Sequence, residues 1–212
     1  MDNRIEEDDL QIQLKKFAKW AQKAGKYGLV KCSSGNLSHR LKDGNLLVSE
    51  SRSWLGELKN DQITLIDGLY GTTIKGNKPT GELPLHLAIM KRNLNVNTIL
   101  HCQSPAATAL SCMDKAVDYN VIIEVPIYIG NIIHIPFIMP GSLELADQVA
   151  EASMNATVIQ MQNHGQVVIG AGYREVIQRA VFFELACSII LQLKSQHTTL
   201  SSQNIEHLKG YR

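Results

Sequence analysis

The segment Thr98-Ile99-Leu100-His101-Cys102-Gln103-Ser104-Pro105 is an apolar run that ends in an imidazole and an amide just before a proline. Side chains alternate along a strand, so His101 and Gln103 face one side and Cys102 faces the other. Proline is tolerated in the first turn of a helix, so Pro105 favours a helix that starts directly after the strand. The segment therefore predicts a buried strand that presents two polar side chains at its end.

The rest of the chain mixes helical and strand patterns. Hydrophobic periodicity predicts helices over 10–24, 82–93, 105–113, 143–154 and 173–195. It predicts strands over 33–41, 46–48, 63–67, 71–74, 97–102, 121–125, 127–138, 157–161 and 166–169. Hairpin turns such as Asp43-Gly44 outnumber strand–helix–strand units. We therefore expect an α/β fold, with a largely antiparallel sheet covered by helices.

Length and composition limit the class of protein. A chain of 212 residues with 44% hydrophobic and 19% charged residues predicts one globular domain over 1–212, with a core over about 10–195 and a polar tail over 196–212. A formal net charge of +1 gives no electrostatic reason to expect nucleic acid or a membrane as a partner. The acidic N-terminus does not resemble a signal peptide, and the four cysteines form no CxxC pair. These features favour a cytoplasmic protein with reduced thiols.

Two apolar strands end in histidine, which suggests a metal centre. His101 and Gln103 would lie about 6–7 Å apart at their Cα atoms, close enough to converge on one ion. Imidazole suits zinc, whereas the Gln103 carbonyl is a weaker ligand for such a metal. His164 ends a second strand and is followed by Gly165, which permits close approach of another group. Polar groups at strand ends without any ligand remain the alternative for each histidine.

Two further segments carry candidate chemistry. In Asn77–His86, "NKPTGELPLH", a turn places Glu82 at a helix start, four residues before His86 and on the same helix face. Glu82 is either a carboxylate stabilised by the helix dipole or a general acid/base beside a metal. In "CSSGNLSHR", Gly35 and Asn36 either expose backbone N–H groups to an anion or form an ordinary turn.

Taken together, four motifs resemble the class II aldolase/adducin family, which includes fuculose- and rhamnulose-phosphate aldolases and ribulose-phosphate epimerases. The motifs are "SSGNLS", "KPTGELPLH", "ILHCQSPAATAL" and "QNHGQVVIG", and the resemblance runs from about Phe17 to Leu193. Their order and spacing also fit, because Glu82 precedes His101 by 19 residues and His164 follows it by 63.

The resemblance implies a three-layer α/β/α fold with a central, mostly antiparallel sheet, assembled as a homotetramer with active sites at subunit interfaces. It implies a divalent metal, usually zinc, held by the positions of His101, Gln103 and His164, with Glu82 close by as acid/base. The substrate phosphate would rest on small residues that correspond to Gly35, Asn36, Ser51 and Thr80. A tyrosine often assists in this family, and Tyr119 and Tyr211 are the candidates.

The chain departs from the family pattern at three positions. Gln103 replaces a histidine ligand, Gly81 stands where a second serine is common, and Arg52 stands where a glycine is usual. Arg52 adds a bidentate donor for phosphate or carboxylate, fills the pocket, or lies on the surface.

The resemblance implies a metal-dependent aldolase, an aldehyde-lyase. L-Fuculose 1-phosphate is the first substrate to test, with dihydroxyacetone phosphate and an aldehyde as the expected products. An epimerase or another lyase on the same scaffold is the nearest alternative. A non-catalytic, adducin-like binding module is the alternative that Gln103 raises. A thiol enzyme is disfavoured, because Cys102 is expected to point away from His101.

Overall fold

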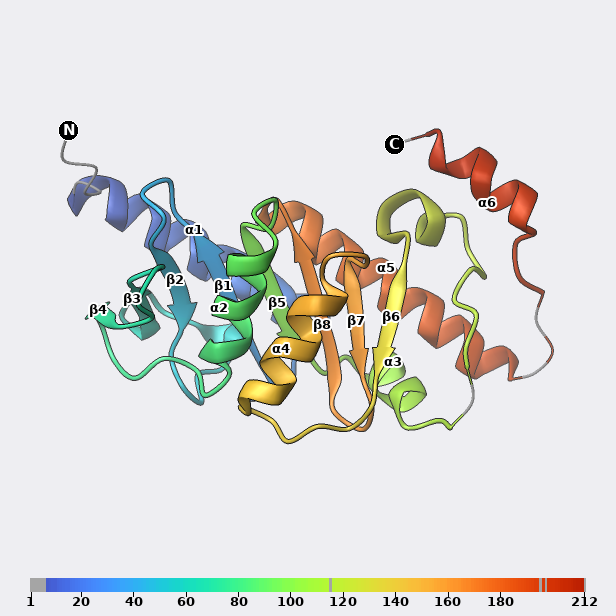
Figure 1. Cartoon of the computed structure of the whole chain (residues 1–212), viewed down its shortest axis with the longest axis horizontal. Coiled ribbons are helices and arrows are strands. Elements are labelled where there is room, and N and C mark those ends of the chain that lie inside the picture. The colour runs from blue at the N-terminus through green and yellow to red at the C-terminus, as the bar shows by residue number, and fades with distance from the viewer. Residues whose placement is uncertain (1–6, 115, 195, 197, 212) are drawn as a thin grey trace.

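The computed structural model describes residues 7–114, 116–194, 196 and 198–211. Its eight described strands form one sheet in the order β4-β3-β2-β1-β5-β8-β7-β6 (Figure 1). Within the described chain β6 and β7 pair in parallel and the other neighbours are antiparallel, so the predicted mostly antiparallel sheet is confirmed. The strands are β1 (Gly35–Arg40), β2 (Leu46–Ser49), β3 (Ile63–Ile66), β4 (Thr73–Lys75), β5 (Thr98–Cys102), β6 (Ile132–Ile135), β7 (Val158–Met161) and β8 (Gly165–Gly170).

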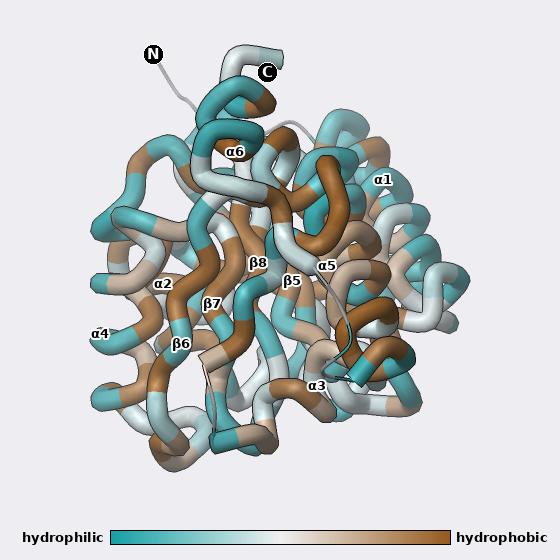
Figure 2. The backbone as a smooth tube through the Cα atoms, turned by 90° about the vertical axis from the view of Figure 1, so that its right-hand side faces the viewer, coloured by the Kyte–Doolittle hydropathy of each residue, from teal (hydrophilic) through white to brown (hydrophobic). Residues whose placement is uncertain are grey.

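Helices cover both faces of this sheet (Figures 1 and 2). One face carries α2 (Leu83–Arg92) and α4 (Leu143–Ala152), and the other carries α1 (Glu7–Lys26), α3 (Pro105–Ser111) and α5 (Tyr173–Leu193). Each interface has its own apolar core. Leu100 and Cys102 of β5 belong to the core beneath α1 and α5, whereas Ile99 belongs to the core beneath α2 and α4. The three-layer prediction is confirmed, and His101 faces the α2 side, as the strand alternation predicts.

One predicted segment is wrong. Residues 121–125 and 127–138 are not strands except at β6; Val125–Ile129 instead forms a π-helical turn, η3. Pro126 has no N–H to give to a ladder, and Gly130 at φ 76° reverses the chain before β6. In an isoleucine-rich run nearly every position is apolar, so the hydrophobic pattern does not distinguish a buried helical turn from a strand.

Helix α5 is long and apolar enough to meet the length and composition criteria for a membrane span. In this fold it instead packs one face into the core, where Val176, Phe183 and Cys187 are fully buried. Its Glu184 side chain also accepts hydrogen bonds from the backbone N–H groups of Ala106 and Ala107, 2.8 and 2.9 Å long. These hydrogen bonds cap the start of α3 directly after β5. Because α5 buries one face and bonds to a neighbouring helix, we interpret it as a core helix.

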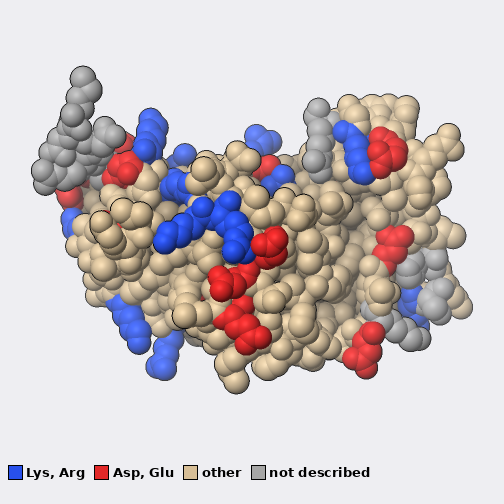
Figure 3. All heavy atoms as spheres, viewed as in Figure 1, with Lys and Arg blue, Asp and Glu red and all other residues tan. Residues whose placement is uncertain are grey.

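The tail predicted as a polar appendage contains one more helix, α6 (Ser202–Lys209), capped by the Ser201 hydroxyl. The Leu200 N–H donates to Asn120 O, 2.8 Å away, which ties the start of the tail to the body. On the α2–α4 face, basic and acidic side chains lie side by side, including the Arg92–Glu151 ion pair at 2.9 Å (Figure 3). This mixture gives that face no extended field of one sign.

Candidate metal centre

Glu82 lies at the start of α2, where the chain leaves the edge of the sheet. Thr80 N donates to Ser49 O at the end of β2, and Glu82 N donates to the Thr80 hydroxyl, 3.3 Å away. Pro84 then occupies the first turn of the helix, where its missing N–H costs nothing. These local contacts place the buried Glu82 carboxylate over β1 and β5.

His101 lies on β5, in the middle of the sheet and opposite Asn36 of β1. Its Nδ1 atom lies 3.1 Å from Gln166 O of β8, and a carbonyl oxygen only accepts hydrogen bonds. Nδ1 is therefore protonated, which leaves the lone pair on Nε2. That Nε2 faces Glu82 Oε2 at 3.5 Å.

His164 lies in the tight turn between β7 and β8. The turn needs Asn163 at φ 54° and Gly165, where a Cβ atom would come within 2.6 Å of Cys102 O. The close approach of this turn to the end of β5 brings His164 Nε2 to 3.5 Å from Glu82 Oε1. The two imidazole rings lie 4.8 Å apart between centroids.

The three side chains fit a divalent cation. One ligand atom from each of Glu82, His101 and His164 lies within 4.8 Å of the others. Atoms bound to a tetrahedral zinc at about 2.0–2.1 Å are roughly 3.3 Å apart, close to the two 3.5 Å separations. Glu82 Oε1 is buried without a hydrogen-bond partner among the described residues, which a bound cation would remedy.

The charges in this cluster support each other. Burial alone would raise the pKa of Glu82, but His101, the Asn36 hydrogen bond and His164 hold it below its ordinary value. Burial, together with the charge of His101, lowers the pKa of His164, although Glu82 acts in the opposite direction. An ionised carboxylate beside His164, an imidazole with a lowered pKa, is a donor pair that suits a borderline metal.

Sequence reasoning noted His86 but missed the network it belongs to. Ser38 Oγ and His86 Nδ1 are 2.6 Å apart, and His86 Nε2 lies 2.5 Å from Asn36 Oδ1. Asn36 Nδ2 donates to Glu82 Oε2 at 3.0 Å. The signal was present as an i, i+4 pair on the helix and an i, i+2 pair, Asn36 and Ser38, on the strand.

His86 makes the folded protein sensitive to acid. Full burial lowers its pKa to about 4, below the value near 6.5 of an unfolded chain. Below pH 6.5 the unfolded chain takes up a proton on this histidine and the folded protein does not. The free energy of unfolding is therefore highest above pH 6.5 and falls by on the order of 1 kcal/mol per pH unit as the pH drops toward 4. Urea unfolding of His86→Gln at several pH values is expected to show a weaker dependence over this range than the wild type. Identical slopes would contradict this account.

Gln103, predicted as the third metal ligand, lies beside the triad. Its Cγ atom would lie 2.8 Å from a Cβ placed at Gly165, next to His164. The side chain is half-buried, and its amide has no hydrogen-bond partner within the described chain. Its role as a ligand stays a prediction.

The Gln103 prediction is tested by restoring the stronger ligand. Gln103→His is expected to tighten zinc binding about tenfold or more, because imidazole binds zinc better than an amide oxygen. Competition with a chromophoric chelator measures the dissociation constant, and Gln103→Ala is the matched control. If the histidine and alanine variants bind zinc equally, Gln103 does not face the ion.

Of the residues predicted to bind phosphate, Asn36 and Thr80 contact Glu82, whereas Ser51 and Arg52 lie on a loop that pairs with the segment before Thr80. Ser51 N donates to Lys78 O at 2.9 Å, and Glu50 forms a bridge with Pro79, so this loop runs beside Thr80. Arg52 is exposed at φ 64°, and its guanidinium has no partner in the described residues. Gly35 packs on the His101 carbonyl, where a Cβ would lie 2.9 Å away. The Asn36 amide is already used by Glu82 and His86, so its side chain is not open to an anion.

The two candidate tyrosines are not brought to the triad by this chain. Tyr119 is buried against His134 and Phe183, and its hydroxyl has no hydrogen-bond partner in the part of the chain that the structure describes. Tyr211 is exposed beyond α6, against His207. Their participation stays a prediction.

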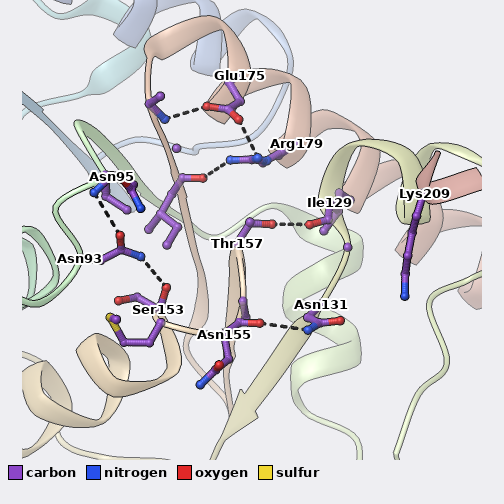
Figure 4. Close-up of a pocket in the computed structure, with 17 residues that line it drawn as sticks. Asn93, Asn95, Ile129, Asn131, Ser153, Asn155, Thr157, Glu175, Arg179 and Lys209 are labelled. Atoms are coloured by element: carbon purple, nitrogen blue, oxygen red, sulfur yellow. Dashed lines mark hydrogen bonds and ion pairs between the residues drawn. The ribbon is translucent and has the colours of Figure 1, made fainter. Parts of the chain in front are cut away.

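A cavity of about 570 Å³ lies where β6 and β7 begin and β8 ends, at the other ends of the strands from His101 and His164 (Figure 4). Its polar side chains mostly bind backbone: Asn93 donates to Ser153 O, and Arg179 donates to Ile169 O. None of the predicted site residues lines it, so it is separate from the metal centre.

Residues 15–191 match the family model "Class II Aldolase and Adducin N-terminal domain". The chain belongs to the class II aldolase/adducin family. The family resemblance that the sequence motifs carried is therefore confirmed.

Two relatives of this chain have different activities. The chain is 33% identical over 168 residues to the 3-oxo-tetronate 4-phosphate decarboxylase of Haemophilus influenzae, covering 77% of this chain and 79% of that protein. It is 35% identical over 156 residues to the L-fuculose phosphate aldolase of Methanococcus maripaludis, covering 73% and 83%. The crystal structure of YgbL from Escherichia coli, titled a putative aldolase/epimerase/decarboxylase, superposes with a TM-score of 0.89 at 27% identity, covering 94% and 99%.

Proposed function

We propose that this protein is a metal-dependent lyase that forms the enediolate of dihydroxyacetone phosphate, and that it does so by decarboxylation. The proposed substrate is a 3-oxo acid with a terminal phosphate, such as 3-oxo-tetronate 4-phosphate. The observation that carries this proposal is the convergence of Glu82, His101 and His164, with one Glu82 oxygen left unpaired. The similarity to the Haemophilus influenzae decarboxylase supports the choice of substrate.

The chemistry needs few groups. A divalent cation held by His101, His164 and Glu82 would supply a Lewis acid for the substrate carbonyl. The bond between the carboxylate and the neighbouring hydroxylated carbon breaks, and its electron pair moves into the carbonyl to give CO₂ and an enediolate. A proton must then add to the carbon that lost CO₂ to yield dihydroxyacetone phosphate, and Glu82 would pass that proton from solvent to the carbon.

Aldol cleavage of a ketose 1-phosphate, such as L-fuculose 1-phosphate, is the second candidate. It passes through the same enediolate but releases an aldehyde, so another base must take the proton of the aldehyde-forming hydroxyl. The similarity to the Methanococcus maripaludis aldolase keeps the aldol reaction as the second candidate.

A binding module without catalysis is disfavoured on energetic grounds. Burying Glu82 Oε1 without a hydrogen-bond partner among the described residues costs about 1–3 kcal/mol. A domain with no ligand at this place gains nothing in return. An epimerase remains distinguishable by its products, because it breaks no carbon chain for good.

The substrate phosphate is proposed to lie on Ser51, Arg52, Thr80 and the backbone near Gly35. Thr80 contacts Glu82, the segment before Ser51 pairs with Pro79, and Arg52 offers a planar pair of donors that suits a phosphate. We further propose a cytoplasmic homotetramer with sites at subunit interfaces. Exposed apolar side chains support a covering subunit, because Phe137, Met139 and Leu143 flank Gly141, which approaches Gly81 O.

One experiment tests the proposed function. The purified protein with zinc, manganese or cobalt is incubated with 3-oxo-tetronate 4-phosphate and, separately, with L-fuculose 1-phosphate. Coupled reduction of dihydroxyacetone phosphate reports both reactions, while CO₂ and aldehyde assays separate them. Decarboxylation with the higher kcat/KM is expected. Faster aldehyde release would favour the aldol reaction, and failure to form dihydroxyacetone phosphate from either substrate would overturn the proposal.

A further inference from the structure

A chain of buried hydrogen bonds leads from the interior to the Glu82 carboxylate. Asn36 and Ser38 are side by side on one face of β1, and Glu82 and His86 are one turn apart on α2 above them. All four side chains are buried. We name the series Ser38–His86–Asn36–Glu82 the positioning chain.

The direction of each hydrogen bond follows from chemistry. A carboxylate only accepts, so the Asn36 atom that faces Glu82 Oε2 at 3.0 Å is the amide nitrogen. Asn36 Oδ1 is then an acceptor, and His86 Nε2, at 2.5 Å, must be its donor. With Nε2 protonated in a neutral ring, His86 Nδ1 accepts from the Ser38 hydroxyl at 2.6 Å. Every donor therefore points toward Glu82.

This order makes the two Glu82 oxygens different. Oε2 is fixed by Asn36, whereas Oε1 has no hydrogen-bond partner among the described residues and faces His164 Nε2 at 3.5 Å. If His86 gave no donor, the Asn36 amide would be free to rotate and turn its oxygen toward the carboxylate. The resulting repulsion would displace Glu82 from its place in the triad.

We propose that His86 is a positioning residue, which holds the Asn36 amide so that Glu82 presents Oε1 to the substrate and the metal site. The expected effect of His86 on kcat rests on the proposed function. The expected effect of His86 on metal affinity rests only on the hydrogen bonds. Residues that orient the groups around a metal typically contribute about 10–100-fold in affinity or activity.

Two amide variants separate positioning from packing. In His86→Gln the amide nitrogen reaches the place of Nε2 and is able to donate to Asn36, whereas in His86→Asn it reaches only the place of Nδ1, near Ser38. We expect His86→Asn to lower kcat about 10–100-fold at unchanged KM, and His86→Gln to rescue most of that loss. Thermal unfolding shows whether both variants fold equally well.

Equal kcat values for the two variants, whether both high or both low, would overturn the proposal. If His86→Asn does not fold, Ser38→Ala supplies the test: a lower kcat at unchanged KM supports the positioning chain, and a wild-type kcat overturns it.

Cobalt titration separates this result from failure of the proposed function. If the wild type binds cobalt but forms no dihydroxyacetone phosphate, a weaker cobalt affinity in His86→Asn than in His86→Gln supports the chain, and equal affinities overturn it.

Discussion

Replacing His101 with alanine is expected to abolish metal binding and to lower kcat/KM by about 10³-fold or more. The substitution removes one of the two imidazoles that face Glu82, and the loss of a Lewis acid removes several kcal/mol of transition-state stabilisation. The fold should survive, because the β1–β5–β8 ladder that carries His101 is made by backbone groups. Elemental analysis, steady-state kinetics and circular dichroism measure these three effects.

The matched control is His134→Ala. His134 is an exposed strand histidine on β6, outside the triad, so its removal should leave metal content and turnover near the wild-type values. Wild-type zinc occupancy in His101→Ala would contradict the assignment of the metal centre. Loss of metal in both variants would point to a general effect on folding.

Replacing Glu82 with glutamine is expected to lower kcat by roughly 10²–10⁴-fold while KM changes little. Glutamine keeps the volume of the side chain and an oxygen that accepts from Asn36, but it cannot carry a proton to the substrate carbon. Single-turnover measurements with the metal-loaded variant separate the chemical step from binding.

The control for the charge change is Glu57→Gln, at an exposed position in the short helical turn Leu55–Glu57. It should retain wild-type kinetics. A Glu82→Gln variant with wild-type kcat would remove Glu82 from the proton transfer. A variant with wild-type kcat but a raised KM would assign Glu82 to substrate binding alone.

The sequence predicted much of this fold because most of its signals are local. The alternation around His101 correctly placed Cys102 in the core and His101 on the opposite face of the sheet, which the structure shows to be the α2 side. Pro105 marked the start of α3, and Gly165 marked a close backbone approach. The local pattern gave a wrong prediction at η3, where an apolar run with Pro126 forms a helical turn. A strand needs another strand to pair with, and hydrophobic periodicity does not show whether one is present.

The candidate site was only partly predictable for a related reason. Glu82, His101 and His164 were each visible as a polar residue at the end of an element, and the structure brings them together. The hydrogen bonds that orient them depend on pairings across the sheet: His101 binds a backbone carbonyl of β8, and Asn36 meets His86 across two elements. Such contacts follow from strand register, which a single sequence does not specify.

The most direct test of the account is the metal content of the purified wild-type protein, measured by elemental analysis before and after incubation with zinc, manganese or cobalt. The account predicts about one divalent cation per chain, lost in the His101→Ala variant and retained in His134→Ala. A wild-type protein that holds no metal and takes up none of the three ions would contradict the metal centre, and with it the proposed lyase.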